Sequence, residues 1–270
     1  MIVLVRGGGD LASGVALRLH RCGLRVAVTE LPQPLAVRRL VSFAEAVYAR
    51  ACTVEGVEAR LVSDSLDSLS VLQVFSKGRI PVLVDPEGKS AQTLHPMVIV
   101  DARMRKCAPE PMRHNAVLYI GLGPGFVAGE NCHVVIETNR GHSLGRVIWQ
   151  GAAQSDTGVP EAMGQRQAER VLRAPADGAL TPLAQLGDCL EAGQPIFDVA
   201  GQVTAAPFAG VLRGLLHPSV PVHQGMKVGD LDPRLEPGLC TQVSDKALAV
   251  GGGVLEALLS RPDLRKSFWS

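Results

Sequence analysis

The chain opens with a short apolar run that ends at three consecutive glycines, and this start limits its fold more than any other feature. Residues 2–6 (IVLVR) are β-branched and apolar enough for a buried strand. Residues 10–22 then carry apolar side chains at helical spacing, and Gly23 supplies a stop signal. A strand, a glycine turn and a helix in this order predict the first unit of a parallel sheet, because parallel strands need a crossover connection.

The same alternation of apolar strands and helices continues over the first half of the chain. Further strands are predicted at 25–30, 80–85, 97–103, 116–123, 133–139 and 145–150, and amphipathic helices at 35–43 and 64–77. The last two strands are separated by a short turn, which favours a hairpin at one edge. We therefore predict an α/β fold, with a Rossmann-like doubly wound sheet over residues 1–151.

An internal repeat follows a polar stretch that we interpret as a linker at 152–172. Residues 174–196 align with residues 206–228 at an offset of 32, which places the prolines and glycines in register: Pro175 with Pro207, Gly178 with Gly210 and Gly193 with Gly225. A fixed period indicates two copies of one small unit that bury their apolar faces on each other. The repeat predicts an all-β module at 173–233, followed by a C-terminal helical segment at 234–270.

The repeated A-P-x-x-G pattern resembles that of biotinyl and lipoyl carrier domains, which implies a barrel-sandwich fold for this module. In such domains the turn between the two halves presents a lysine that receives the cofactor. The corresponding turn here, at 197–205, contains no lysine. We therefore expect no covalent biotin or lipoate, and a role in docking or packing for the module.

Composition excludes several classes of partner. The 270 residues carry a net charge of +1 and only 4% aromatic residues, which gives no electrostatic or stacking reason to expect nucleic acid. No apolar run approaches the ~20 residues that span a bilayer, and no export signal is visible, so we expect a cytoplasmic protein without membrane association. The six cysteines form no C-x-x-C pair. Homo-oligomerisation stays open.

The glycine turn is the first candidate binding site. Its residues fit the G-x-G-x-x-A pattern that brings a dinucleotide pyrophosphate to a helix N-terminus, and they run Gly7, Gly8, Gly9, Asp10, Leu11 and Ala12. Glu30 ends the second strand, where an acid can hydrogen-bond a ribose. Asp10 would repel a phosphate, although it could cap the helix instead. A tight turn without a ligand is the alternative.

Polar residues and glycines follow the later strands, where open α/β sheets place their ligands. Asp85 and Asp101 each end a strand, and a further nest of amides is predicted at Gly121, Gly123 and Gly125. A possible oxoanion or metal cluster comprises His133, Glu137, Arg140 and His142. The alternative is that these four residues are structural and that Arg140 serves only as an ion-pair partner.

Two smaller features of the sequence also allow a structural and a functional interpretation. Cys132 precedes His133, and a thiol beside an imidazole can be activated, although an ordinary buried thiol is the simpler interpretation. Residues 244–262 form a helical pattern loosened by the glycines at 251–253. These glycines predict a close backbone contact with the first domain, or with a ligand.

Several motifs together resemble one protein family, with no single motif accounting for the likeness. They include RGGGDLASGVALRLHRCG (6–23), IPVLVDPE (80–87), HVVIETNRGH (133–142) and SDKALAVGGGVLEALL (244–259). The chain is similar over nearly its whole length to the YqeB-type family of accessory proteins for selenium-dependent molybdenum hydroxylases. Its N-terminal half resembles the Rossmann part of XdhC-like maturation factors.

The resemblance implies an accessory role in the maturation of xanthine-dehydrogenase-like enzymes. The chain would bind a nucleotide- or molybdopterin-type cofactor and a client hydroxylase or its maturation factors. No catalytic residue can be carried over from the family. The alternative function is an NAD(P)-dependent oxidoreductase that uses Gly7, Gly9, Ala12 and Glu30, although no Tyr-x-x-x-Lys pair accompanies them.

Overall fold

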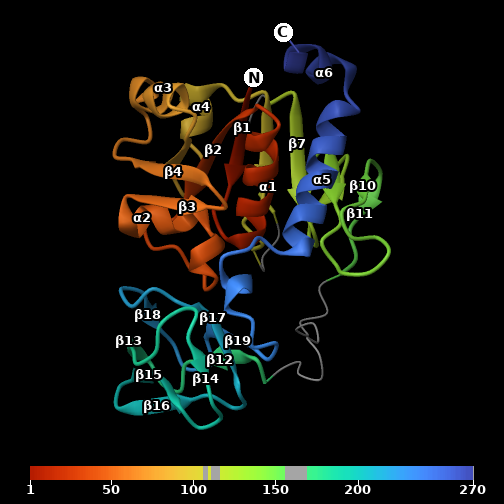
Figure 1. Cartoon of the computed structure of the whole chain (residues 1–270). Coiled ribbons are helices and arrows are strands. Elements are labelled where there is room, and N and C mark those ends of the chain that lie inside the picture. Colours follow the sequence, from red (N-terminus) through yellow and green to blue (C-terminus); the bar gives the residue numbers. More distant parts are fainter. Residues whose placement is uncertain (106–108, 111–115, 156–168, 270) are drawn as a thin grey trace. The chain divides into compact units, whose positions relative to one another are not determined.

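The computed structural model describes residues 1–105, 109–110, 116–155 and 169–269 (Figure 1). These residues fall into two compact units. Unit 1 comprises Met1–Pro34, Ser42–Asp156 and Val243–Ser270, and unit 2 comprises Leu35–Val41 and Thr157–Gln242. The C-terminal helices therefore belong to unit 1 rather than to a segment of their own. Much of the predicted linker, at 156–168, lies outside the described residues.

Unit 1 is built on a nine-stranded mixed sheet. Its strands are β1 (Ile2–Arg6), β2 (Arg25–Glu30), β3 (Ala51–Val54), β4 (Val57–Val62), β5 (Ile80–Val84), β6 (Val98–Asp101), β7 (Leu118–Leu122), β9 (Val134–Ile136) and β10 (Val147–Ile148). Their order across the sheet is β10-β9-β7-β6-β1-β2-β5-β4-β3. The strands between β10 and β3 are parallel, and these two edge strands are antiparallel to their neighbours. A separate short ladder joins β8 (Val127–Ala128) to β11 (Gly151–Ala152).

The strand order corrects the prediction of a Rossmann-like sheet. In the Rossmann order, the third parallel strand lies beside the second. Here the third parallel strand along the chain is β4. It does not lie beside β2, because β5 lies between them. The cause is the β3–β4 hairpin, which the sequence analysis missed. Its turn residues Glu55 and Gly56 both have positive φ, as a tight hairpin turn requires.

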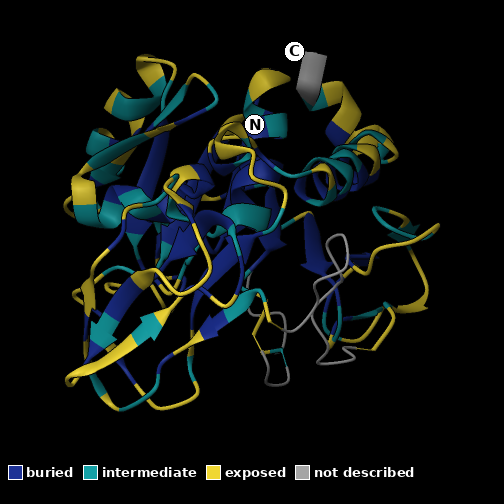
Figure 2. Ribbon diagram, turned by 60° about the horizontal axis from the view of Figure 1, so that its bottom comes forward, coloured by how far each residue is buried: buried dark blue, intermediate teal, exposed yellow. Residues whose placement is uncertain are grey.

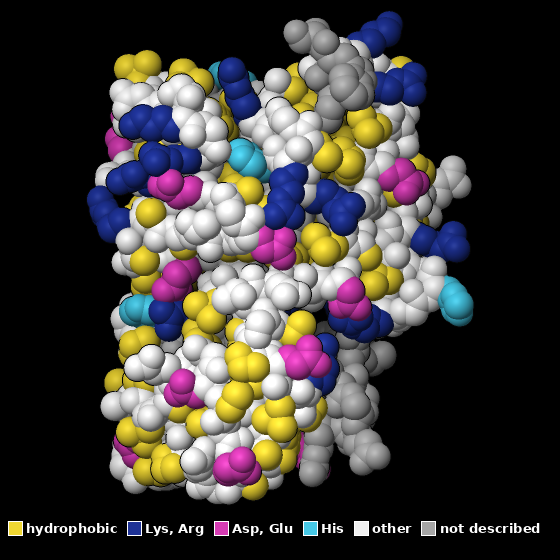
Figure 3. All heavy atoms as spheres, in the orientation of Figure 1, with side chains coloured by type: hydrophobic (Ala, Val, Ile, Leu, Met, Phe, Trp, Pro, Cys, Tyr) yellow, Lys and Arg dark blue, Asp and Glu magenta, His cyan; other side chains and the backbone are white. Residues whose placement is uncertain are grey.

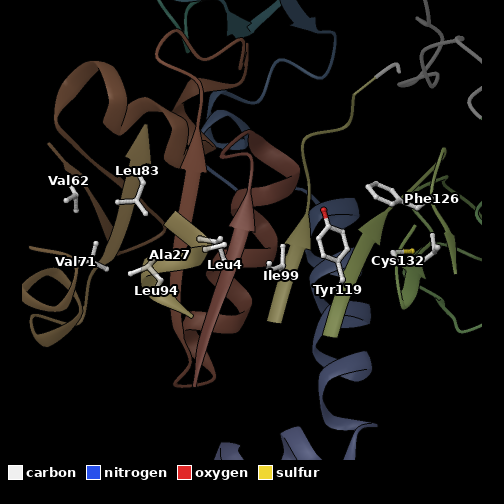
Figure 4. Close-up of a cluster of buried hydrophobic side chains, with 12 residues drawn as sticks. Leu4, Ala27, Val62, Val71, Leu83, Leu94, Ile99, Tyr119, Phe126 and Cys132 are labelled. Carbon is white, nitrogen blue, oxygen red and sulfur yellow. The ribbon is translucent and has the colours of Figure 1, made fainter. Parts of the chain in front are cut away.

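Helices cover both faces of the sheet. They are α1 (Asp10–Arg21), α2 (Ala46–Ala49), α3 (Ser68–Ser76), α4 (Ser90–Leu94), α5 (Asp245–Leu259) and α6 (Pro262–Trp269), with the 3-10 turn η2 (Phe43–Glu45). The 3-10 turns η1 (Arg39–Val41) and η3 (Pro237–Cys240) belong to unit 2. One face carries a buried cluster that includes Leu4, Ile99 and Tyr119 and is covered by Val71 of α3 and Leu94 of α4 (Figure 4). The strands are the most deeply buried part of the unit (Figure 2). None of the helices in the described residues is long and apolar enough to cross a membrane.

Glycines bring α5 close to α1 and to the sheet. A Cβ at Gly14 of α1 would lie 2.5 Å from the Ala247 Cβ, and one at Gly253 would lie 2.1 Å from the Gly145 carbonyl oxygen. A Cβ at Gly251 would lie 3.1 Å from the Gly14 oxygen. The glycines at 251–253 do not interrupt α5, and Gly251 and Gly253 make the close backbone contact that the sequence predicted.

Unit 2 consists of two four-stranded antiparallel sheets. The strands are β12 (Val171–Arg173), β13 (Gly178–Pro182), β14 (Cys189–Leu190), β15 (Pro195–Val199), β16 (Gln202–Ala205), β17 (Gly210–Leu215), β18 (Pro221–Val222) and β19 (Lys227–Asp232). The sheet orders are β12-β19-β17-β14 and β16-β15-β13-β18. A change of four in each strand number converts one order into the other: β12 corresponds to β16, β19 to β15, β17 to β13 and β14 to β18. Each sheet therefore contains strands from both copies of the repeat.

Candidate functional site

The parallel sheet has a switch point between β1 and β6. The chain continues from β1 to β2 on one side, and β6 later pairs with β1 on the other side. Connections diverge at such a point, and this leaves room for a ligand beyond the carboxyl ends of the strands. Arg6 ends β1 and Asp101 ends β6, and the two residues are paired in the ladder. Both side chains continue the sheet face that carries Leu4 and Ile99.

Five side chains meet at this edge, and we call them the switch-point cluster: Arg6, Asp101, Arg103, Glu110 and Tyr119. The Asp101 carboxylate accepts hydrogen bonds from Arg103 Nε at 2.9 Å and Nη2 at 2.6 Å. The Tyr119 hydroxyl donates to Asp101 Oδ2 at 3.0 Å. Figure 4 shows this hydroxyl directed toward the arrowheads of the neighbouring strands. Asp101 therefore links the side chains of the cluster, and its oxygens accept hydrogen bonds mainly from Arg103 and Tyr119.

Arg6 is deeply buried but weakly bonded. Its side chain is 4% exposed, and its Nη1 donates to the Tyr119 hydroxyl at 3.3 Å. Among the described residues this is the side chain's one hydrogen bond, and the nearest carboxylates, Asp101 and Glu110, are both 3.6 Å away. Gly88 lies close to the guanidinium, and a Cβ there would be 3.4 Å from Nη2. A guanidinium has five N–H donors, and Arg6 uses one of them in a hydrogen bond within the described residues, so donor capacity remains for a ligand.

The protonation states in the cluster favour an anionic ligand. Burial, together with the negative charge of Asp101, raises the pKa of Tyr119 to about 12, so its hydroxyl stays a donor. The pKa of Glu110 is lowered by a hydrogen bond from Arg105 and, despite some desolvation, by the charges of Arg103 and Arg6. The cations that surround Glu110 thus already stabilise one negative charge.

The glycine turn is held by the protein itself. The Gly8 amide donates to Glu30 Oε2 at 2.7 Å, and the Leu31 amide donates to Oε1 at 2.7 Å. The Gly8 carbonyl accepts from the Ala44 amide at 2.8 Å and from the Ser13 hydroxyl at 3.0 Å. Burial raises the pKa of Glu30, although both amides oppose this rise. Glu30 therefore ties the turn to β2, and neither of its oxygens is left without a backbone partner.

Asp10 does not cap α1, although the sequence allowed that role for it. Gly9 is the N-cap, Asp10 is the first helical residue, and no side chain caps the helix. Leu11 is half-buried and Ala12 is buried. A Cβ at Gly9 would meet nothing within 4 Å, so this is the one position of the turn that faces open space.

The predicted residues at the ends of β5 and β7 form local hydrogen bonds or allow close packing within unit 1. Asp85 accepts from the amides of Gly88, Lys89 and Ser90 and so fills the amide nest of its own turn. A Cβ at Gly121 would lie 2.2 Å from the Phe126 ring, and one at Gly123 would lie 2.3 Å from the Thr138 hydroxyl. The Gly123 amide already donates to the Ile136 carbonyl. A Cβ at Gly125 would lie 3.5 Å from Pro109.

The predicted cluster around β9 is not assembled. His133 precedes β9 and Glu137 follows it, so about 13 Å of strand separates them. His133 is exposed, and its Nδ1 accepts from the Tyr119 amide at 2.8 Å. Glu137 is buried and accepts from the amides of Asn139 and Gln154. A period of two places both residues on one face, but it does not place them at the same end of the strand.

Arg140 and His142 lie apart from this pair. Arg140 forms a two-pronged ion pair with Asp245 in the first turn of α5, and His142 is exposed. Within residues 1–105, 109–110, 116–155 and 169–269, no three His, Cys, Asp or Glu side chains are placed to hold a metal ion. Burial raises the pKa of Cys132 to about 11, which is the opposite of an activated thiol.

Sequence reasoning missed four of the five residues in the switch-point cluster. Asp101 was predicted, but Arg6, Arg103, Glu110 and Tyr119 were not. One signal was available for Arg6, which is a charged residue at the end of an otherwise apolar strand, directly before the glycines. A second missed network lies in unit 2, where the buried Arg213 pairs with Asp230 and Asp232.

Comparison with known proteins identifies one relative in sequence. The chain is 46% identical over 258 residues to the uncharacterized protein YqeB of Escherichia coli (strain K12). The chain is thus similar to YqeB. The match covers 96% of this chain and 47% of YqeB, so the chain spans about half the length of this relative. No protein-family model matches the chain.

Two solved structures resemble the chain only distantly. One is an aspartoacylase family protein from Mesorhizobium loti, with 12% identity, a TM-score of 0.26 and coverage of 85% of this chain and 83% of that one. The other is a succinylglutamate desuccinylase from Silicibacter sp. TM1040, with 13% identity, a TM-score of 0.25 and coverage of 85% and 84%.

The predicted combination of a Rossmann-like sheet and a biotinyl/lipoyl-like barrel-sandwich is wrong, because β5 lies beside β2 in the sheet and β4, the third parallel strand of the chain, does not. The fold is instead a mixed α/β architecture with a large parallel-rich sheet. YqeB is described as an uncharacterized protein, so the predicted role with molybdenum and selenium enzymes gains no support from it.

Proposed function

We propose that unit 1 of this YqeB relative binds a small phosphate-bearing ligand at the switch-point cluster. The observation that carries the proposal is Arg6, a guanidinium with a 4% exposed side chain that makes one hydrogen bond of 3.3 Å. Burying a charged group is costly unless it is paired and hydrogen-bonded. An anion that accepts from Arg6 would supply the missing partners.

Phosphate suits the donors of the cluster. A guanidinium presents a rigid fork that matches two phosphate oxygens, and Arg103 lies beside Arg6 on the same carboxylate. The charges of the cluster, together with Arg105, are three positive and two negative. On the face shown in Figure 3, basic side chains lie among acidic ones. The proposal therefore rests on a buried guanidinium and not on a broad basic patch.

The wider role that we propose is that of an accessory protein for molybdenum hydroxylases of the xanthine dehydrogenase type. Its support is the resemblance of sequence motifs alone. Molybdopterin nucleotides and other nucleotides carry the phosphate groups that the cluster suits. The NAD(P)-dependent oxidoreductase is the weaker alternative, because both Glu30 oxygens already bond backbone amides instead of standing open to a ribose.

The test is calorimetric titration of the full chain with pyrophosphate, NAD, NADP and a molybdopterin nucleotide. We expect binding of at least one of these ligands, about tenfold weaker binding in Arg6→Lys, and loss of binding in Arg6→Gln. Arg60→Gln is the matched control, because Arg60 lies on β4 of the same sheet with its side chain 52% exposed. The proposal is wrong if no ligand binds, or if a folded Arg6→Gln binds as well as the natural chain.

A further inference from the structure

Glu110 is the most exposed member of the switch-point cluster, with a side chain that is 44% exposed. Its Oε1 accepts from Arg105 Nη1 at 2.5 Å and lies 3.6 Å from Arg103 Nη1. Its Oε2 lies 3.6 Å from Arg6 Nη2. One carboxylate is therefore shared by three guanidiniums. One of them comes from β1, and the other two come from the segment that follows β6.

The exposure of these side chains increases from the interior toward solvent. The exposed fraction is 4% for Arg6, 17% for Arg103, 43% for Arg105 and 44% for Glu110. Glu110 thus lies on the solvent side of Arg6. A ligand that binds Arg6 therefore competes with the Glu110 carboxylate, which lies 3.6 Å from the guanidinium.

We propose that Glu110 is an internal competitor that makes this site selective for phosphate-type dianions over monocarboxylates. The inference rests on the proposed function, and it adds the ligand class and the residue that sets it. Glu110 takes the position of an anionic group of the ligand, and its lowered pKa keeps it charged at neutral pH.

The selectivity follows from the charges that are exchanged. A monocarboxylate that replaced Glu110 would bring the same charge and the same two acceptor oxygens. It would also compete with a group whose effective concentration is on the order of millimolar or higher, because that group belongs to the same chain. A phosphate dianion brings a second negative charge and a third acceptor oxygen, and it can use the donors that Arg6 leaves unbonded.

The experiment compares inorganic phosphate with acetate as probes, by calorimetric titration at one ionic strength. The variants are Glu110→Gln and Glu191→Gln, and both raise the net charge by one. Glu191 is the matched control because it is an exposed carboxylate of unit 2. Arg6→Gln is added in both the natural and the Glu110→Gln background.

For the natural chain and for Glu191→Gln, we expect phosphate to bind and acetate to show no measurable binding. In Glu110→Gln, acetate binding should appear and phosphate binding should tighten about tenfold or more, because the competitor is gone. Both gains should disappear when Arg6→Gln is added, since Arg6 is the shared receptor.

Other outcomes separate the two proposals. If phosphate binds the natural chain through Arg6 but Glu110→Gln changes neither probe, the competitor role is wrong and the proposed function stands. If Glu110→Gln weakens phosphate binding, Glu110 positions the arginines and the inference is also overturned. If no variant binds either probe while all keep the melting temperature of the natural chain, both proposals fail.

Discussion

Arg6 and Asp101 face each other at the carboxyl ends of β1 and β6, with Nη1 of the arginine 3.6 Å from Oδ2 of the aspartate. Both side chains are almost completely buried. Asp101 nevertheless accepts its close hydrogen bonds from Arg103 and Tyr119. The arrangement holds a guanidinium at the switch point without saturating it, and this is the basis of the ligand proposal.

Asp101→Asn should destabilise unit 1 strongly. Removing the carboxylate charge leaves Arg6 buried beside a neutral amide and breaks the two-pronged pair with Arg103. Loss of one partner from a buried ion pair costs about 3 kcal/mol or more of unfolding free energy. Urea unfolding of this variant and of Glu191→Gln would measure the loss, and a change below about 1 kcal/mol would contradict the structural role of Asp101.

Two adjacent glycines should respond differently to alanine. A Cβ at Gly8 would lie 2.9 Å from the backbone nitrogen of Ala44, whereas a Cβ at Gly9 would meet nothing within 4 Å. Gly8→Ala should therefore lower the unfolding free energy by about 1–3 kcal/mol through overpacking. Gly9→Ala should leave it within about 1 kcal/mol, because Gly9 has an ordinary φ of −65°.

Ligand binding by the same region is a separate measurement. Gly9→Val should keep the fold and weaken binding of a phosphate-bearing ligand only if the ligand extends over the start of α1. Calorimetry and thermal melting on the same samples separate the two effects. Unchanged binding would place the ligand on the Arg6 side of the sheet edge alone.

Arg140 and Asp245 should couple weakly. Their side chains are 35% and 72% exposed, and exposed ion pairs contribute about 0.2–1 kcal/mol. A double-mutant cycle with Arg140→Ala and Asp245→Ala should give a coupling energy in that range, reduced by high salt. A coupling energy near zero at low salt would show that the pair is not formed in solution.

Tyr119 should titrate late and make the folded state sensitive to alkali. Its pKa of about 12 lies above the unfolded value of about 10, so its contribution to stability is complete below pH 10. This contribution is lost as the pH rises through the folded pKa, because the unfolded chain ionises first. Tyrosinate absorbance during an alkaline titration of the natural chain and of Tyr119→Phe would measure the pKa of Tyr119. A Tyr119 that ionises near pH 10 in the folded chain would contradict its burial beside Asp101.

The local features of the sheet could be predicted from sequence because they depend on neighbouring residues. The strands at 2–6, 25–30 and 80–85 are runs of apolar residues, and their burial requires no information from elsewhere in the chain. The β3–β4 hairpin was missed, although its Glu55-Gly56 turn carries a recognisable signal. That omission left out two strands of the sheet, because the hairpin occupies the edge beyond β5.

By itself, the sequence determined the alternating elements, the glycine-dependent contact of the last helix and the offset of 32 that relates the halves of unit 2, since each is a local or periodic property of the chain. Only the tertiary structure decided which polar side chains meet. His133 and Glu137 share a strand and are separated by its length, whereas Arg6, Asp101 and Tyr119 are far apart in sequence and meet because parallel strands end at one edge. Periodicity specifies the face of a side chain, but strand order and register specify its neighbours.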